Sequence, residues 1–398
     1  MYEKQHSSGN VSDSQARDQF AQAMIDAMKS CRGNLAITYD RDNFQIDISG
    51  GTTLLLENVY REWSSAKAST TIRDIAHGWT QNWEMVASAS LESMRPHLLP
   101  IVDILYRTLA PKPVKYAHAS APAYQLLGDH VTVEIARDLP DHIMFLDKAQ
   151  LLKLSISFEE AIAVAKENLR RVSTKALIRR PSGLMISPWQ DNYDSARLTI
   201  LDELVPGALH DDLVAMIPHR DCLLVAPANN EPALAEMATI AKLRRQGPRF
   251  LSGIPLLRSG GTWKTFIPPE CSSVYSPFRE LRLRSLASHY VHQDKNRELL
   301  AYCQDVDVIA SVFIGETCID EFTLAFWMRD YVTLLPEVTY VVFTNPAAGD
   351  QERVVYGNVL WERVHQVMGY RMQPLGTYPE RWRVEAFPSP AEMKEMGL

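Results

Sequence analysis

The chain has 398 residues, of which 46% are apolar and 22% charged, a composition typical of a globular protein with room for two or three domains. Its formal net charge of −7 argues against a protein whose main partner is nucleic acid. No run of eighteen apolar residues occurs, so no membrane partner is expected. The five cysteines form no C-x-x-C pair, which favours a reducing, cytoplasmic setting without disulfides.

The first part of the chain is expected to combine helices with antiparallel hairpins. Residues 1–14 are polar and are expected to form a disordered lead. Apolar spacing and turn residues then predict, in chain order, a helix at 15–29, a hairpin at 35–39 and 44–48, helices at 54–63 and 72–85, strands at 130–135 and 142–146, and a helix at 158–169. Ser157 precedes the last of these helices and is expected to cap it.

The next part is expected to continue the same mixture. The predicted elements are a short strand at 184–186, a helix at 194–204, a tight hairpin at 213–217 and 222–226, a helix at 231–245, and a hairpin at 250–257 and 262–267. Hairpins mixed with helices, in place of regular βαβ alternation, favour an α+β fold for a main domain at residues 15–268.

A stretch rich in proline, serine and cysteine, residues 268–277, is expected to mark a domain boundary. Beyond it the patterns predict a strand at 306–313, a helix at 320–335, a strand at 339–344 and a helix at 359–368. This strand–helix–strand order indicates a smaller C-terminal α/β unit at residues 278–398.

Several short motifs occur in a fixed order within residues 15–268. They are the segment 95–100, the pair Asn168-Leu169, the segment Asp191–Arg197, the corner Pro218–Asp221 and the pair Leu251-Ser252. In this order the motifs resemble those of the YtpQ family, a bacterial domain family of unknown function. The chain has Ser195-Ala196 where that family more usually has alanine before serine. The resemblance implies a bacterial protein with this main domain, and it carries no mechanism because the family has no established activity.

Two polar segments carry the candidate catalytic side chains. They are Asp191, Asp194 and Arg197 in the first segment and His219, Arg220 and Asp221 in the second. In a structural interpretation Asp191 or Asn192 caps a helix, Asp194 pairs with Arg197, and Asp221 accepts bonds in a turn. In a catalytic interpretation the segments face each other across a cleft. There a carboxylate orients His219 as a general base, and an arginine holds a phosphate or carboxylate.

Two further patterns have alternative interpretations. Four aromatic residues recur near helical spacing and would form either core or a partner-binding surface: Phe322, Phe326, Trp327 and Tyr331. Basic residues gather in Lys166–Arg180 and in Lys242–Arg249, where they form either solvated helix faces or a patch for nucleic-acid phosphates.

The function expected from these patterns is that of a non-catalytic interaction or regulatory module with an unidentified protein partner. No P-loop, H-E-x-x-H or G-x-G-x-x-G motif is present, and neither a cofactor nor a metal is expected. The alternative is a hydrolase or phosphate-handling enzyme that uses the Asp/Arg/His cluster. Nucleic-acid binding through the basic runs is the weaker alternative. An open cleft between the two polar segments would favour the enzyme, and a closed polar network would favour the module.

Overall fold

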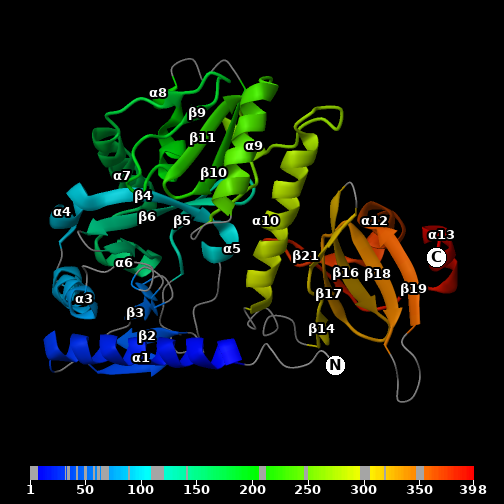
Figure 1. The fold of residues 1–398 in the computed structure, drawn as a ribbon, viewed down its shortest axis with the longest axis horizontal. Helices are drawn as coiled ribbons and strands as arrows, with labels where there is room; N and C mark the ends of the chain where they lie inside the picture. The colour runs from blue at the N-terminus through cyan, green and yellow to red at the C-terminus, as the bar shows by residue number, and fades with distance from the viewer. Residues whose placement is uncertain are drawn as a thin grey trace. The chain divides into compact units, whose positions relative to one another are not determined.

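The computed structural model describes residues 8–31, 33, 36–41, 44–48, 52–56, 59–60, 63, 71–87, 90–108, 121–139, 142–205, 212–245, 250–295, 305–317, 320–346 and 354–398 (Figure 1). Its helices and largely antiparallel sheets confirm the expected α+β class. Contacts divide the chain into two compact units. The first unit comprises residues 1–99, 112–121 and 136–161, and the second comprises residues 100–111, 122–135 and 162–398. The expected boundary at 268–277 lies inside the second unit, so a separate C-terminal domain stays a prediction.

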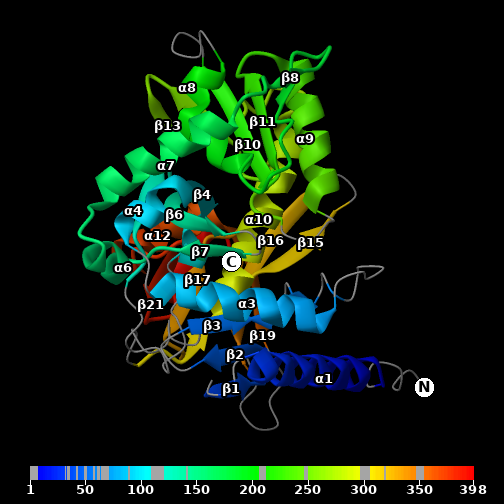
Figure 2. The ribbon, with the colours of Figure 1, turned by 90° about the vertical axis from the view of Figure 1, so that its left-hand side faces the viewer.

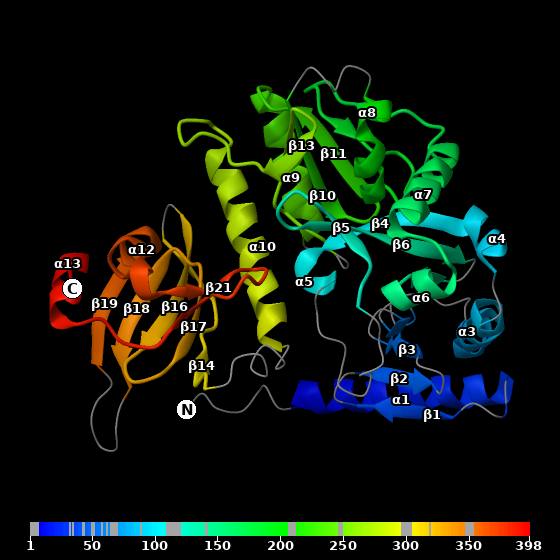
Figure 3. The same ribbon diagram turned by 180° about the vertical axis from the view of Figure 1, so that it is seen from behind.

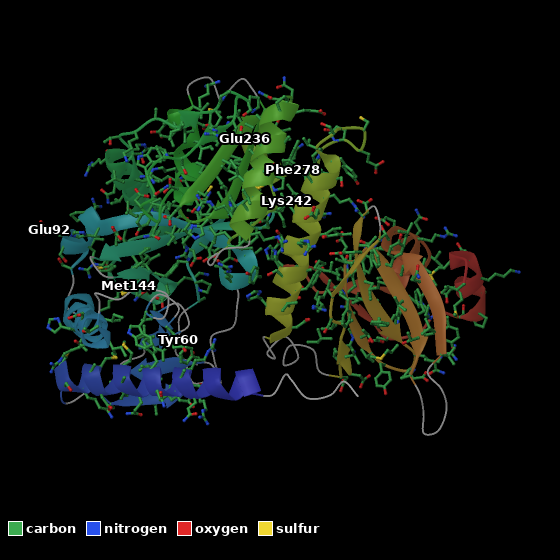
Figure 4. The ribbon with its side chains drawn as sticks, in the orientation of Figure 1. Tyr60, Glu92, Met144, Glu236, Lys242 and Phe278 are labelled. Atoms are coloured by element: carbon green, nitrogen blue, oxygen red, sulfur yellow. The ribbon has the colours of Figure 1, made fainter. Side chains whose placement is uncertain are left out.

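The division between the units falls within three elements, which are β4 (Leu98–Ile104), β6 (Val131–Leu139) and α7 (Phe158–Val172). The first unit also contains α1 (Ser8–Cys31), β1 (Ile37–Asp40), β2 (Gln45–Ile48), β3 (Thr52–Leu55), α3 (Ile72–Ala87), α4 (Leu91–Met94), η1 (Arg95–His97), β7 (His142–Phe145) and α6 (Lys148–Lys153). Strands β1 to β3 form an antiparallel meander, and α1 packs against both α3 and this sheet. Phe20, Met24 and Ile46 are buried in the shared core, where Tyr60 meets Phe20 edge to face (Figure 4).

Most predictions for the first unit are confirmed. The hairpins β1–β2 and β6–β7 form as expected, and Ser157 caps α7 through reciprocal bonds with Glu160. The helix expected at 54–63 is wrong at its start, because Leu54 lies in β3 and pairs with Ile46. Pairing along β2 places Leu54 in the core, which outweighs its local helical spacing. Helix α1 begins at Ser8, so residues 8–14 are helical where a disordered lead was expected, and residues 1–7 lie outside the described chain.

A six-stranded antiparallel sheet organises the first part of the second unit. Its order is β13-β12-β10-β11-β9-β8. The bounds are β8 (Ile178–Arg179), β9 (Met185–Ile186), β10 (Leu213–His219), β11 (Cys222–Pro227), β12 (Leu256–Ser259) and β13 (Thr262–Thr265). Also present are α5 (Leu105–Thr108), β5 (Tyr124–Leu127), η3 (Ser195–Ile200), α8 (Leu201–Leu204) and α9 (Glu231–Arg245). Figure 2 shows α9 running alongside β10 and β11, where it buries Leu234 and Met237. The predicted hairpin at 213–226 and helix at 231–245 are confirmed.

Helix α10 (Tyr275–Lys295) was not expected from the sequence. Its first half lies beside α9, where Phe278 is buried and Lys242 pairs with Glu280 (Figure 4). Its second half places Ala287 and Tyr290 in a different core, formed by the C-terminal strands. Because the helix buries different faces along its length, its apolar residues form no single stripe that periodicity would detect.

The C-terminal part of the second unit contains two four-stranded sheets. One has the order β14-β17-β21-β20 and the other β15-β16-β18-β19. The bounds are β14 (Val308–Ile309), β15 (Phe313–Glu316), β16 (Glu321–Met328), β17 (Thr333–Pro336), β18 (Tyr340–Asn345), β19 (Val354–Leu360), α12 (Trp361–Met368), η4 (Gly369–Arg371), β20 (Gln373–Pro374), β21 (Arg381–Val384) and α13 (Pro390–Met396). Helix α12 lies behind β18 in Figure 1 and in front of it in Figure 3, so it covers one face of the second sheet.

The helix expected at 320–335 is wrong, because this segment forms β16 and β17. Along β16 the side chains alternate between buried and partly exposed, and Ala325 and Trp327 face the core. Alternation with a period of two is the strand pattern, and β15 and β18 pair with both edges of β16. The strand expected at 306–313 is likewise two strands, β14 and β15, whereas β18 and α12 confirm the predictions at 339–344 and 359–368.

Candidate functional site

The two polar segments contact each other directly, within the second unit. The backbone N–H of Ser195 donates to the carbonyl of Arg220 over 2.9 Å, and the N–H of Asn192 donates to the Asp221 carboxylate. The expected helix at 194–204 begins as the 3₁₀ helix η3 and continues as the single turn α8. This winding brings the loop before η3 against the corner between β10 and β11.

Arg197 is the centre of the first segment. Its side chain is fully buried, and Nη1 and Nη2 donate to the two carboxylate oxygens of Asp191 over 2.8 and 2.7 Å. Its Nε donates to the Ser173 hydroxyl over 2.8 Å, and the guanidinium lies 4.0 Å from the ring centroid of Trp189. This two-pronged, charge-assisted pair with a stacked indole holds the loop in one geometry.

The expected ion pair between Asp194 and Arg197 is wrong. The cap expected from Asp191 or Asn192 is also wrong, because Asp194 precedes η3 and no side chain caps that helix. Asp194 is fully buried and accepts backbone N–H bonds from Trp189 and Asp191 over 3.2 and 3.3 Å. Gln190 and Asn192 have positive φ angles of 55° and 67°, and these turn the chain so that Asp191 faces Arg197. Spacing along an ideal α-helix does not describe this 3₁₀ segment and its looped approach.

The electrostatics of Asp191 follow from its position. Partial burial of the carboxyl group acts to raise its pKa, but the hydrogen bonds and charge of Arg197 outweigh burial and hold the pKa below its usual value. Asp191 therefore stays ionised near neutral pH, when its attraction to Arg197 is fully present, and this attraction weakens as acid protonates the carboxylate.

The second segment forms separate contacts. The Asp221 N–H donates to Nδ1 of His219 over 3.1 Å, and that nitrogen lies 3.6 Å from the Asp221 carboxylate. Because Nδ1 accepts this bond, it does not present a proton to the carboxylate, and the arrangement differs from a carboxylate-oriented general base. Arg220 pairs with the buried Asp103 over 3.0 Å.

These contacts make a polar network with limited solvent access. Arg197 and Asp194 are fully buried, while the side chains of Asp191, His219 and Asp221 keep 35%, 15% and 26% exposure. Both oxygens of Asp191 are occupied by Arg197, so this pair holds the loop and does not present a guanidinium for a phosphate. The arrangement fits a structural clamp between η3 and the β10–β11 corner.

The four aromatic candidates do not share a surface. Trp327 is 1% exposed and packs in the C-terminal core, so its assignment to a partner surface is wrong. Phe322 and Phe326 lie on the opposite face of β16, and Tyr331 follows the strand and is exposed. The helical stripe fails because this segment is a strand.

Four of the nine described residues in the basic runs pair with nearby carboxylates. Arg170 bonds to Glu203 and Glu167, and Arg180 bonds to Glu236. Such pairs reduce the positive potential that a phosphate backbone would need. Local pairing therefore neutralises part of these runs, and the proposal of nucleic-acid binding gains no support from this part.

Sequence reasoning missed a buried group of imidazole and phenol rings in the second unit. His289 Nδ1 lies 3.3 Å from the hydroxyl of Tyr378, which also stacks with His130, and the Tyr106 ring lies 4.6 Å from that of His289. Burial lowers the pKa of His130 to about 4, against the opposing charge of Asp129, and burial likewise holds the pKa of His289 well below its usual value. These residues are far apart in the sequence and have no spacing signature, so only the fold brings them together.

The buried His130 predicts a loss of stability in mild acid. In the unfolded chain a histidine binds its proton near pH 6.5, whereas folded His130 does so near pH 4. The unfolded state therefore binds more protons between these values, and stability should fall by up to about 3 kcal/mol as pH decreases through this window. Urea unfolding at pH 7.5 and pH 5 measures the effect.

The variant His130→Phe removes the titrating group and should show a smaller loss between the two pH values. Replacement of the exposed His97 is the matched control and should leave the wild-type slope unchanged. An identical slope for His130→Phe and wild type would contradict the assignment to His130.

Comparison with known proteins found no match: no protein-family model, curated protein or solved structure matches the chain. The resemblance to the YtpQ family therefore stays a prediction. Across the described ranges, no helix is long and apolar enough to cross a membrane. In the same part of the chain, no group of three or more His, Cys, Asp or Glu side chains is placed to hold a metal ion.

Proposed function

We propose that the protein is a non-catalytic interaction or regulatory module that binds a protein partner through one face of the β15-β16-β18-β19 sheet. The supporting observation is the composition of the face turned away from the core, here called the outer face. Strand register assigns to it Phe313, Gly315, Phe322, Leu324, Phe326, Met328, Tyr340, Val342, Thr344, Val355, Asn358 and Leu360.

The register and the burial of the strands agree on this assignment. Residues paired directly across neighbouring strands share a face, and Phe313 pairs with Leu324, which pairs with Tyr340, which pairs with Leu360. Their neighbours Ala325, Val341 and Val359 are buried in the core. Apart from the buried Thr344, the outer-face residues are partly exposed on β16 and β18, and at the sheet edges Phe313, Val355 and Leu360 are 50%, 57% and 48% exposed.

An outer face of this composition is unusual for a sheet that contacts solvent. Sheets with one face on the core normally carry polar residues on the other. None of the twelve described outer-face residues is an acid, lysine, arginine or histidine. Contiguous exposed apolar residues indicate an interaction site.

The closed network at Asp191 and Arg197 supports the non-catalytic part of the proposal. Its buried arginine and both carboxylate oxygens are used for internal bonds. The hydrolase or phosphate-handling alternative would need this pair to separate before it could grip a substrate. The cytoplasmic, bacterial setting belongs to the same proposal and rests on the cysteine usage and the YtpQ resemblance.

Photo-crosslinking from the outer face tests the proposal. A benzoylphenylalanine at position 326 should crosslink a specific protein in cells that produce this chain natively, and the same probe at the exposed Leu243 of α9 should not. Binding of the identified partner should then be reconstituted with purified proteins.

The reconstituted complex gives the decisive measurement. Phe326→Glu should weaken its dissociation constant at least about tenfold, because a charge would be buried in an apolar contact. Leu243→Glu should leave the constant unchanged. Equal crosslinking from both positions, or binding that is insensitive to Phe326→Glu, would show that the outer face is not the partner site.

A further inference from the structure

We propose that the outer face binds a second copy of this chain, through face-to-face packing of two β15-β16-β18-β19 sheets. This inference rests on the proposed function and specifies its partner. The face is self-complementary in charge and in hydrogen-bonding groups, which are properties that a two-fold interface requires.

The charge argument begins with symmetry. In a two-fold dimer the same patch is present on both sides, so a patch of one sign would repel its own copy. The whole chain carries a net charge of −7, so many surface pairings would bring acidic regions together. The outer face avoids this repulsion, because none of its described residues carries a charge.

The polar groups of the face are also self-complementary. Asn358 on β19 has an amide that both donates and accepts, and the hydroxyl of Tyr340 on β18 does the same. Each can therefore bond to the equivalent group, or to the other, in a second copy. A partner with unpaired charges would bury them against apolar side chains at a cost that this pairing avoids.

The centre of the inner face of the sheet, which faces the core, is covered and does not provide the contact surface. Trp327, Val341 and Phe343 on that side are already buried with Val364 and Met368 of α12. Glu316 and Glu321, at the hairpin between β15 and β16, are bound there by Arg284 of α10. Among the described residues we therefore assign sheet-on-sheet packing, in which two sheets lie about 10 Å apart, to the outer face.

The area of the outer face determines how tightly the two copies are expected to bind each other. With strands about 4.8 Å apart and about 3.3 Å per residue, four strands of about five residues cover roughly 300 Å² in projection. A standard interface buries about 800 Å² per partner. The expected dimer is therefore reversible and dissociates on dilution, and an obligate dimer is not expected.

Sedimentation velocity of the purified full chain tests this inference. The wild type should shift from monomer toward dimer as its concentration rises. Phe326→Glu and Phe326→Lys should each remain monomeric at every concentration, because each places like charges in the contact. An equimolar mixture of the two variants should recover the dimer, because opposite charges then meet.

Controls separate loss of contact from loss of fold. Leu243→Glu adds the same charge to an exposed apolar site on α9 and should dimerise like wild type. Circular dichroism and thermal unfolding of the Phe326 variants check the fold, and Val342→Glu, on the adjacent strand, gives a second disruption of the same face. A wild type that stays monomeric at all concentrations would overturn the inference, as would a Phe326→Glu variant that dimerises like wild type.

The two proposals can fail separately. A monomeric wild type together with a different protein crosslinked from position 326 would refute the second copy and leave the interaction module intact. A monomeric wild type with no specific crosslink would refute both.

Discussion

Replacing Arg197 with alanine is expected to lower the free energy of unfolding by roughly 3–5 kcal/mol, the range for breaking a buried ion pair. The fully buried guanidinium bonds to Asp191 and Ser173 and stacks on Trp189, so its removal leaves three groups without their shared partner. Because the Asp191 side chain keeps 35% exposure, water can solvate part of the orphaned carboxylate, and the lower half of the range is expected. Urea unfolding followed by circular dichroism measures the change.

Matched variants identify which interaction of Arg197 accounts for the lost free energy of unfolding. Arg197→Lys keeps the charge without the two-pronged geometry and should retain only part of the stability. Arg170→Ala removes an exposed arginine from its pair with Glu203 and should cost at most about 1 kcal/mol. If Arg197→Ala costs no more than Arg170→Ala, the network is not a structural clamp, and the catalytic interpretation of these residues regains support.

Replacing Trp327 with alanine is expected to cost roughly 3–5 kcal/mol, whereas Phe326→Ala, one residue earlier, should cost far less. Trp327 is 1% exposed and packs against Phe343 and Phe387, while Phe326 lies on the partly exposed outer face. Adjacent residues on a strand point to opposite faces, so the two substitutions remove contacts from different environments. Thermal or urea unfolding of both variants gives the comparison.

The neighbouring strand supplies an independent control pair. Val341 is fully buried and Val342 is partly exposed, so Val341→Ala should be the more destabilising of the two. Equal losses at Trp327 and Phe326, together with equal losses at Val341 and Val342, would contradict the strand register from which the outer face is defined.

Local signals were sufficient for several elements. The hairpin of β10 and β11, helix α9 and the Ser157 cap follow from short-range patterns that the structure confirms. The catalytic interpretation placed the Asp191–Arg197 segment opposite the Pro218–Asp221 corner across a cleft, and in the structure a backbone bond from Ser195 to Arg220 joins the two directly. Such features depend on residues close in the sequence, where capping, turn chemistry and periodicity act.

The secondary structure was predicted wrongly where local helical spacing competes with pairing between distant strands. Phe322, Phe326 and Trp327 satisfy a helical spacing, but in the strand Phe322 and Phe326 lie on one face and Trp327 lies on the other. Pairing of β16 with β15 and β18 decides in favour of the strand, because these partners are remote or separated by a turn. Helix α10 escaped detection for a related reason, since it contributes to two cores in turn.

The amino-acid sequence by itself determined the α+β class, the principal hairpins and helices of the main domain, and which polar residues to examine. Only the tertiary structure decided the partner of Arg197, the burial of Trp327 and the uncharged outer face of the sheet. The physical reason is that local propensities act over a few residues. Whether a side chain is buried, paired or exposed depends instead on surfaces that distant segments supply when they pack.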